Sequence, residues 1–209
     1  MSIIDKLATS LNRRDEVPNQ ELAKEIVGAE NREAIAELIE NLLNKSKDIQ
    51  SDCIKVLYEI GEAKPQMIVA YASNFVELLD SKNNRLQWGA MTALNTIASQ
   101  SPAIVFGALT KLAAVADKGS VITRDKYVSI LTKLCLVDAY KSDAFDLLHE
   151  QFLISPTNQL PMYAENATSI IDKAHQPAFI KTLIARLPEI EKESKRKRVE
   201  KVLKKWQGK

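Results

Sequence analysis

The fold is decided by four short segments, which are Val-Leu-Tyr-Glu-Ile at residues 56–60, Ala-Leu-Asn-Thr-Ile at 93–97, Ile-Leu-Thr-Lys-Leu at 130–134 and Ala-Thr-Ser-Ile-Ile at 167–171. Each segment begins 37 residues after the one before it. When the segments are aligned, only Thr168 interrupts the shared apolar positions. A fixed period of about 20 to 50 residues is typical of repeat proteins, in which each repeat is one supersecondary unit.

Prolines and aspartates near the ends of the predicted helices follow the same period. Pro65 and Pro102 are 37 residues apart, and so are Asp80 and Asp117, each of which follows an apolar stretch. Proline fits the first turn of a helix because the N–H that it lacks has no partner there. The period therefore fixes both the core positions and the helix starts.

Within a repeat, the apolar residues recur at helical spacing. Leu86, Ala90, Ala93, Leu94 and Ile97 fall on one stripe of a helix, and no alternating strand pattern is found. The pattern predicts helices near residues 3–11, 20–28, 32–43, 47–62, 66–79, 84–100, 103–116, 121–137, 141–153, 159–173, 177–187 and 190–206.

Residues 78–97 resemble a HEAT repeat, which has an apolar first helix, a turn that contains aspartate, and a second helix with small and apolar residues at fixed places. Leu78-Leu79-Asp80 match the end of the first helix, and the second-helix positions are Leu86-Gln87, Ala90, Ala93-Leu94 and Ile97. The usual arginine is Gln87 here and Arg124 in the next repeat. The pattern covers roughly residues 30–190 and is shared with armadillo repeats.

The resemblance implies an all-α fold, a right-handed α-α superhelix or HEAT-like solenoid of about five helical hairpins with an N-terminal helical cap. One hairpin cannot bury both of its faces, so stacked neighbours must form a continuous core. We expect a single domain over residues 1–209, with a cap at 1–30, repeats at 31–189 and a basic capping helix at 190–209.

Composition favours a cytoplasmic protein that contacts no membrane. The chain has 209 residues, of which 45% are hydrophobic and 27% charged, and its formal net charge is +2. The N-terminus shows no leader pattern, and no apolar run reaches the length of about 18 residues that a membrane span needs. Residues 189–209 hold nine Lys or Arg against four Glu. The remainder is mildly acidic, which argues against a nucleic-acid-binding surface.

The sequence shows no constellation of catalytic or metal-binding residues. His149 and His175 are the only histidines and lack a second ligand at helical spacing, and no phosphate-binding loop or nucleophile motif occurs. Cys53 and Cys135 occupy columns of small core residues, as buried cysteines do. We therefore expect no enzymatic activity, no cofactor, no metal and no small-molecule substrate.

The second helices of HEAT repeats line a concave face that binds ligands, and the period places six residues of interest on that face. Trp88 falls in a column that is largely polar in the other repeats. It is either an exposed anchor for a partner or a residue that packs on the neighbouring helix. The resemblance thus favours a protein partner bound through a strip of Tyr58, Arg85, Trp88, Asn95, Lys126 and Tyr163.

A DNA-binding protein is the alternative. The HEAT-like alkylpurine DNA glycosylases combine basic, aromatic and carboxylate groups in their concave groove, and the nearest residues here are Trp88, Tyr163, Arg85, Lys126 and Asp125. No motif of those enzymes matches residue by residue, and the dense positive charge that phosphates require is missing. The run Lys195-Arg196-Lys197-Arg198 is either an electrostatic handle or a solvated helix face, and the glutamates around it favour the latter.

Overall fold

The computed structural model describes the backbone of residues 2–207 and the side chains of residues 2–206. Over this range the chain forms twelve α-helices, five short 3-10 helices and no strand, which confirms the predicted all-α class. It divides into two compact units, Met1–Tyr127 and Val128–Lys209, with the boundary inside α8. The expected single domain with an N-terminal cap stays a prediction.

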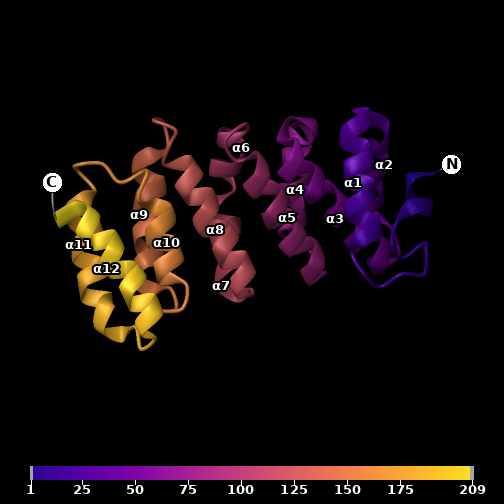
Figure 1. Ribbon diagram of the computed structural model, residues 1–209. Coiled ribbons are helices and arrows are strands. Elements are labelled where there is room, and N and C mark those ends of the chain that lie inside the picture. Colours follow the sequence, from indigo (N-terminus) through magenta and orange to yellow (C-terminus); the bar gives the residue numbers. More distant parts are fainter. Residues whose placement is uncertain (1, 208–209) are drawn as a thin grey trace. The chain divides into compact units, whose positions relative to one another are not determined.

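The first unit is a succession of helices that runs from indigo to rose in Figure 1. Its elements are η1 (Ile3–Lys6), α1 (Val17–Ala29), α2 (Arg32–Glu40), η2 (Asn41–Leu43), α3 (Lys47–Ala63), η3 (Pro65–Met67), η4 (Val69–Tyr71), α4 (Ala72–Leu78), α5 (Asn84–Ile97), α6 (Pro102–Gly107), α7 (Leu109–Lys118) and the first half of α8 (Val121–Leu134).

The second unit is built in the same way. It contains the rest of α8 and then α9 (Lys141–Ile154), α10 (Leu160–Ala167), α11 (Gln176–Arg186), η5 (Leu187–Glu189) and α12 (Glu193–Gln207). Helix α12 packs against α10 and α11, and α9 packs against α10 and α11. No helix in the described range is long and apolar enough to cross a bilayer.

The predicted core positions are buried. Leu57 on α3, Leu94 on α5 and Leu131 on α8 are all 0% exposed. In the first unit α3 lies between α1 and α5 and packs against both (Figure 1). Helices α3 and α5 come together at Gly89, where an added Cβ would lie 2.4 Å from Cγ1 of Ile54. This close contact fixes the relative position of the two helices that carry Tyr58 and Trp88.

Several helices are shorter than their apolar patterns predict. The helix expected at 103–116 is divided at Ala108 into α6, which ends at Gly107, and α7, which begins at Leu109. The helix expected at 159–173 ends at Ala167, and there the Thr168 hydroxyl donates to the carbonyls of Ala164 and Glu165. Such side-chain bonds compete with the next helical turn.

Two further predicted helices begin or remain as 3-10 turns. The expected helix 66–79 starts with η3 and η4, whose turns are held by the buried Met67 and Ile68. The expected helix 3–11 is reduced to η1, and a left-handed residue, Asn12 with φ 53°, follows it. Residues 7–16, between η1 and α1, therefore form an irregular segment that we call the strap, and the buried Leu7 anchors it.

Candidate functional site

A groove of about 850 Å3 opens in the first unit between the strap that precedes α1 and the two helices α3 and α5. We call it the N-terminal groove. It contains three of the six residues predicted to bind a partner, together with charged residues of the strap. The lining includes Arg13, Arg14, Asp15, Glu16, Asn19, Asp48, Asp52, Lys55, Tyr58, Arg85 and Trp88.

Asp52 attaches the strap to α3. Its Oδ2 accepts a hydrogen bond from the backbone N of Thr9 at 2.7 Å, and its Oδ1 accepts one from Asn19 Nδ2 at 2.8 Å. Asn19, which is 2% exposed, in turn accepts a hydrogen bond from the backbone N of Ala8 at 3.0 Å. One carboxylate and one amide thus satisfy polar groups that the irregular backbone leaves without helical partners.

Two aromatic rings form the floor of the groove. Tyr58 on α3 and Trp88 on α5 make an edge-to-face contact with ring centroids 5.2 Å apart. Lys55 Nζ lies over the Tyr58 ring, 4.8 Å from its centroid. Burial raises the pKa of Tyr58 to about 12, so the phenol is protonated at neutral pH. The floor is therefore an uncharged aromatic surface.

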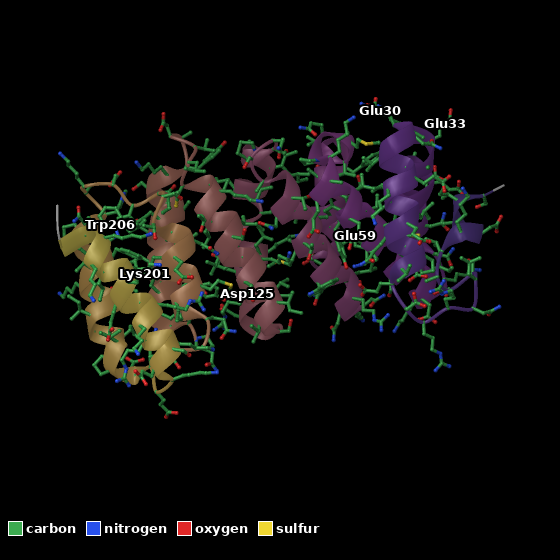
Figure 2. All side chains as sticks on the ribbon, viewed as in Figure 1. Glu30, Glu33, Glu59, Asp125, Lys201 and Trp206 are labelled. Atoms are coloured by element: carbon green, nitrogen blue, oxygen red, sulfur yellow. The ribbon has the colours of Figure 1, made fainter. Side chains whose placement is uncertain are left out.

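Lys55 is held between two glutamates. Its Nζ lies 2.7 Å from Glu16 Oε2 on the strap side and 2.6 Å from Glu59 Oε1 one turn along α3, where Figure 2 labels Glu59. Burial disfavours the charged amine, but the hydrogen bonds to Glu16 and Glu59 outweigh it and raise the pKa of Lys55. The charge of Lys55 is therefore neutralised within the unit.

Trp88 borders two cavities. In addition to the N-terminal groove it lines a second hollow of about 670 Å3, whose other walls come from Leu79 and Asp80 after α4, from the start of α5, from α7 and from the start of α8. Its side chain is half-buried, and its Nε1 is buried without a hydrogen-bond partner among the described residues. A buried indole N–H without a partner is uncommon in proteins.

The N-terminal groove carries no excess of basic residues. Its lining holds four basic and four acidic side chains, namely Arg13, Arg14, Lys55 and Arg85 against Asp15, Glu16, Asp48 and Asp52. A surface that follows a phosphate backbone needs several uncompensated cations. This balance is more typical of a surface that contacts protein.

The six predicted site residues are only partly brought together. Arg85 is exposed and Trp88 half-buried, and both line the groove. Tyr58 also lines it but is 4% exposed, because Trp88 and Lys55 pack on its ring. Tyr58 is therefore less exposed than the strip assignment implies, and its contact with a partner stays a prediction.

The other three residues lie elsewhere. Tyr163 is 1% exposed in the second unit, where α9 and α12 pack on its helix α10, so its expected exposure is wrong. Asn95 and Lys126 are half-buried and belong to the lining of neither cavity. Lys126 Nζ lies 3.9 Å from Glu62 Oε1. A role in binding stays a prediction for all three residues.

The basic run of α12 is engaged inside the second unit. Arg198 makes two hydrogen bonds to Glu165 and lowers the pKa of that carboxyl. Lys197 pairs with Glu193 at 2.6 Å, Lys195 donates to Asn158, and Arg196 donates to the carbonyl of Ile190. These contacts support the interpretation of the run as a solvated, structural helix face.

Metal ligands and reactive thiols were both sought among the residues that the structure describes. No three His, Cys, Asp or Glu side chains are grouped there as metal ligands. Burial raises the pKa of Cys53 to about 12, and that of Cys135 to about 12 as well, so both thiols are protonated. Protonated, buried thiols are poor nucleophiles. The expected lack of enzymatic activity stays a prediction.

Sequence reasoning missed the strap. Arg14 lies outside the repeat, so the period of 37 could not place it, and Asp48 was not projected onto the concave face. The available signal was the cluster of charges at residues 13–16 directly before a helix that starts with proline at its second position. That cluster marks an exposed segment, but nothing in it reveals which helix it covers.

No protein-family model matches the chain, and no curated protein matches it. Solved structures of similar shape do exist. A designed armadillo repeat protein shares 17% identity at a TM-score of 0.66, with 97% of each chain covered. Another, in complex with the peptide (KR)4, shares 16% identity at a TM-score of 0.67, covering 88% of this chain and 85% of that one.

A third similar structure, an engineered protein, shares 20% identity at a TM-score of 0.64, with 98% of each chain covered. At such identities the likeness concerns the fold and not the ligand. It agrees with the period of 37 residues and with the buried leucines of the second helices. The chain therefore has the all-α solenoid fold that HEAT and armadillo repeats share.

Proposed function

We propose that the protein is a non-enzymatic repeat scaffold that binds a protein partner through the N-terminal groove. One observation carries this proposal, namely the half-buried Trp88 on the floor of an open groove with balanced charge. Tryptophan and arginine are the residue types most enriched among the residues that dominate binding energy. Trp88 and Arg85 stand three residues apart on α5, so they share one face of that helix.

The fold supports the same proposal. Helical repeats stack second helices side by side and thereby offer an extended surface. Among the similar structures, one designed armadillo repeat protein was solved with a peptide, and others were designed for modular peptide recognition. Those properties belong to the designed proteins. For this chain they favour a peptide-like segment of a partner as the ligand of the groove.

DNA binding is disfavoured by the groove itself. Its four basic side chains face four acidic ones, and Lys55 and Arg13 are already paired with carboxylates. The Arg85 and Trp88 pair that the DNA-binding alternative would use is present, but Tyr163 is buried and lies in the other unit. We therefore expect duplex DNA to bind weakly and with strong salt dependence.

The test requires a purified partner. Affinity purification from the native organism followed by mass spectrometry would supply candidates, and binding would then be measured with purified components. We expect Trp88→Ala to weaken binding by roughly 2 kcal/mol or more, as for a central aromatic anchor. Trp206→Ala, which truncates a half-buried tryptophan on α12, is the matched control and should leave the affinity within about twofold.

Circular dichroism would establish that both variants stay helical. If Trp88→Ala binds as tightly as the wild type while the control also binds normally, the groove is not the binding site. If a variant in which Lys195 to Arg198 are neutralised loses affinity instead, the basic helix α12 is the functional element.

A further inference from the structure

Helix α12 carries an excess of positive charge that its surroundings do not compensate. Residues Glu193–Gln207 hold seven Lys or Arg against two Glu, and Arg198 pairs with one further carboxylate, that of Glu165 on α10. The excess that remains is four positive charges. The elements that pack against α12 are α10, α11 and η5, and their one other acidic residue, Glu189, pairs with Arg186.

Three lysines of α12 form a stripe that faces solvent. Lys197, Lys201 and Lys204 follow one another at intervals of four and three residues, so they share one side of the helix, and the buried Val199 lies on the opposite side. All three lysines are exposed, and Figure 2 labels Lys201. Within residues 2–206, Lys201 and Lys204 make no hydrogen bond and no ion pair, and the pair that Lys197 forms with Glu193 is itself exposed. We call these three residues the lysine stripe.

Helix α2 presents a stripe of opposite charge with the same spacing. Glu33, Glu37 and Glu40 are also separated by four and three residues, and we call them the glutamate stripe. Glu33, which Figure 2 labels, and Glu40 are exposed and form neither ion pair nor hydrogen bond with the described side chains. Glu37 is half-buried and accepts hydrogen bonds from uncharged groups of residues 2 and 3, so no cation neutralises it. Arg32 is the single cation in the sequence of α2, whose net charge is therefore −2.

The two stripes are complementary in charge and equal in length. Because a helix rises about 1.5 Å per residue, each stripe spans about 10 Å, and its charges stand about one turn apart. Solubility requires only that the outer faces of terminal repeats be polar, and it does not require one sign on the first helical hairpin and the other sign on the last helix. Like stripes repel one another, whereas unlike stripes attract, so the pattern favours contact between a lysine stripe and a glutamate stripe.

We infer that the lysine stripe of one molecule binds the glutamate stripe of a second copy of this chain. The contact joins two different surfaces, so it is heterologous, and a pair of copies still has one stripe of each kind to offer to further copies. Exposed ion pairs contribute little individually and are screened by salt, so the association should be weak and confined to low ionic strength. No residue of either stripe lines the N-terminal groove, so this inference goes beyond the proposed function and does not depend on it.

Sedimentation velocity of the full chain tests the inference. Over about 10 to 500 µM protein, we expect the weight-average sedimentation coefficient to rise with concentration at about 20 mM NaCl and to keep the monomer value at about 500 mM. The double variant Lys201→Glu with Lys204→Glu should abolish the rise, and so should Glu33→Lys with Glu40→Lys. An equimolar mixture of these two variants should restore it, because the exchanged charges are again complementary.

A double variant on α9 is the matched control. Asp146→Lys with Glu150→Lys reverses two exposed carboxylates and changes the net charge by the same amount as Glu33→Lys with Glu40→Lys. It should associate as the wild type does. Circular dichroism would establish that every variant remains helical.

A wild type that stays monomeric at low salt, association that persists in either stripe variant, or a mixture that does not associate would each overturn the inference. So would an equal loss in the α9 control. Binding of an RNA oligonucleotide or of anionic lipid vesicles that requires Lys201 and Lys204, without self-association, would assign the lysine stripe to that partner and also overturn it. Trp88→Ala should leave self-association unchanged, so a failure of this inference is distinguishable from a failure of the proposed function.

Discussion

The ring of Tyr58 meets the indole of Trp88 edge-on, with centroids 5.2 Å apart and planes 82° apart. The two residues belong to different repeats, on α3 and α5, so the contact links neighbouring repeats at the floor of the groove. Tyr58 is almost fully buried and Trp88 is half-buried. The buried ring therefore sets the orientation in which the more exposed ring is presented.

This contact predicts an energetic coupling between the two residues. In a double-mutant cycle on the free energy of unfolding, Tyr58→Ala and Trp88→Ala should show an interaction of about 0.5–1.5 kcal/mol, the usual value for an edge-to-face pair. Tyr58→Phe should retain most of it because the ring stays. Additive effects of the two alanine variants, within about 0.3 kcal/mol, would show that the rings do not support one another.

Asp52 should be needed to hold the strap. Asp52→Ala leaves the N–H of Thr9 and the amide of Asn19 without their acceptor, which should cost about 1–3 kcal/mol in the free energy of unfolding. Chemical denaturation measures this. Glu21→Ala, which removes an exposed carboxylate of α1, is the comparison and should stay within about 0.5 kcal/mol of the wild type. Equal costs for the two variants would contradict the role of Asp52.

Leu94 tests the repeat assignment. Its side chain is 0% exposed, so Leu94→Ala should cost about 2–5 kcal/mol through lost burial and the cavity left behind. Leu43 is 84% exposed and provides the same chemical change at the surface, where the cost should be within about 0.5 kcal/mol. Similar unfolding midpoints for the two variants in urea would disprove the assignment of Leu94 to the core.

The second unit should show a pH dependence at Asp172. Lys141 lies 2.5 Å from Asp172 and, together with the backbone N–H of His175, lowers the pKa of that carboxyl below its usual 3.8. A lowered pKa stabilises the fold above the unfolded value, and the contribution is lost as the pH falls through the folded value. Asp172→Asn keeps a side-chain oxygen that accepts a hydrogen bond from the backbone N–H of His175, but it removes the charge.

The melting temperature of Asp172→Asn should therefore lie below that of the wild type at pH 7, and the gap should narrow as the pH falls below about 4. Thermal melts followed by circular dichroism over this range measure the gap. A gap that stays constant down to pH of about 2 would mean that the charge of Asp172 is not involved.

The period of 37 residues was sufficient to predict the all-α class and the burial of Leu57, Leu94 and Leu131. These positions follow from local helical spacing, and stacked repeats must bury them. Trp88 and Arg85 could also be placed, because both lie on α5 within the best-matched repeat.

The burial of Tyr163 could not be predicted from the sequence, because the repeat pattern assigns the same exposed positions to the second helix of every repeat. Helix α10 is packed by α9 and α12, and the burial of Tyr163 follows from that tertiary arrangement. The position of Arg14 in the groove could not be predicted either, because Arg14 lies in the irregular strap and has no equivalent position in the repeats. Contacts between segments that share no period are set by tertiary packing and not by local pattern.

The most direct measurement of the central claim is hydroxyl-radical footprinting of the complex between the protein and its purified partner, read by mass spectrometry at the two tryptophans. Both Trp88 and Trp206 are half-buried in the free protein, so both should be oxidised and each serves as the other's reference. The groove model predicts that the partner lowers the oxidation of Trp88 several-fold and leaves Trp206 unchanged. Protection of Trp206 with unchanged oxidation of Trp88 would contradict it.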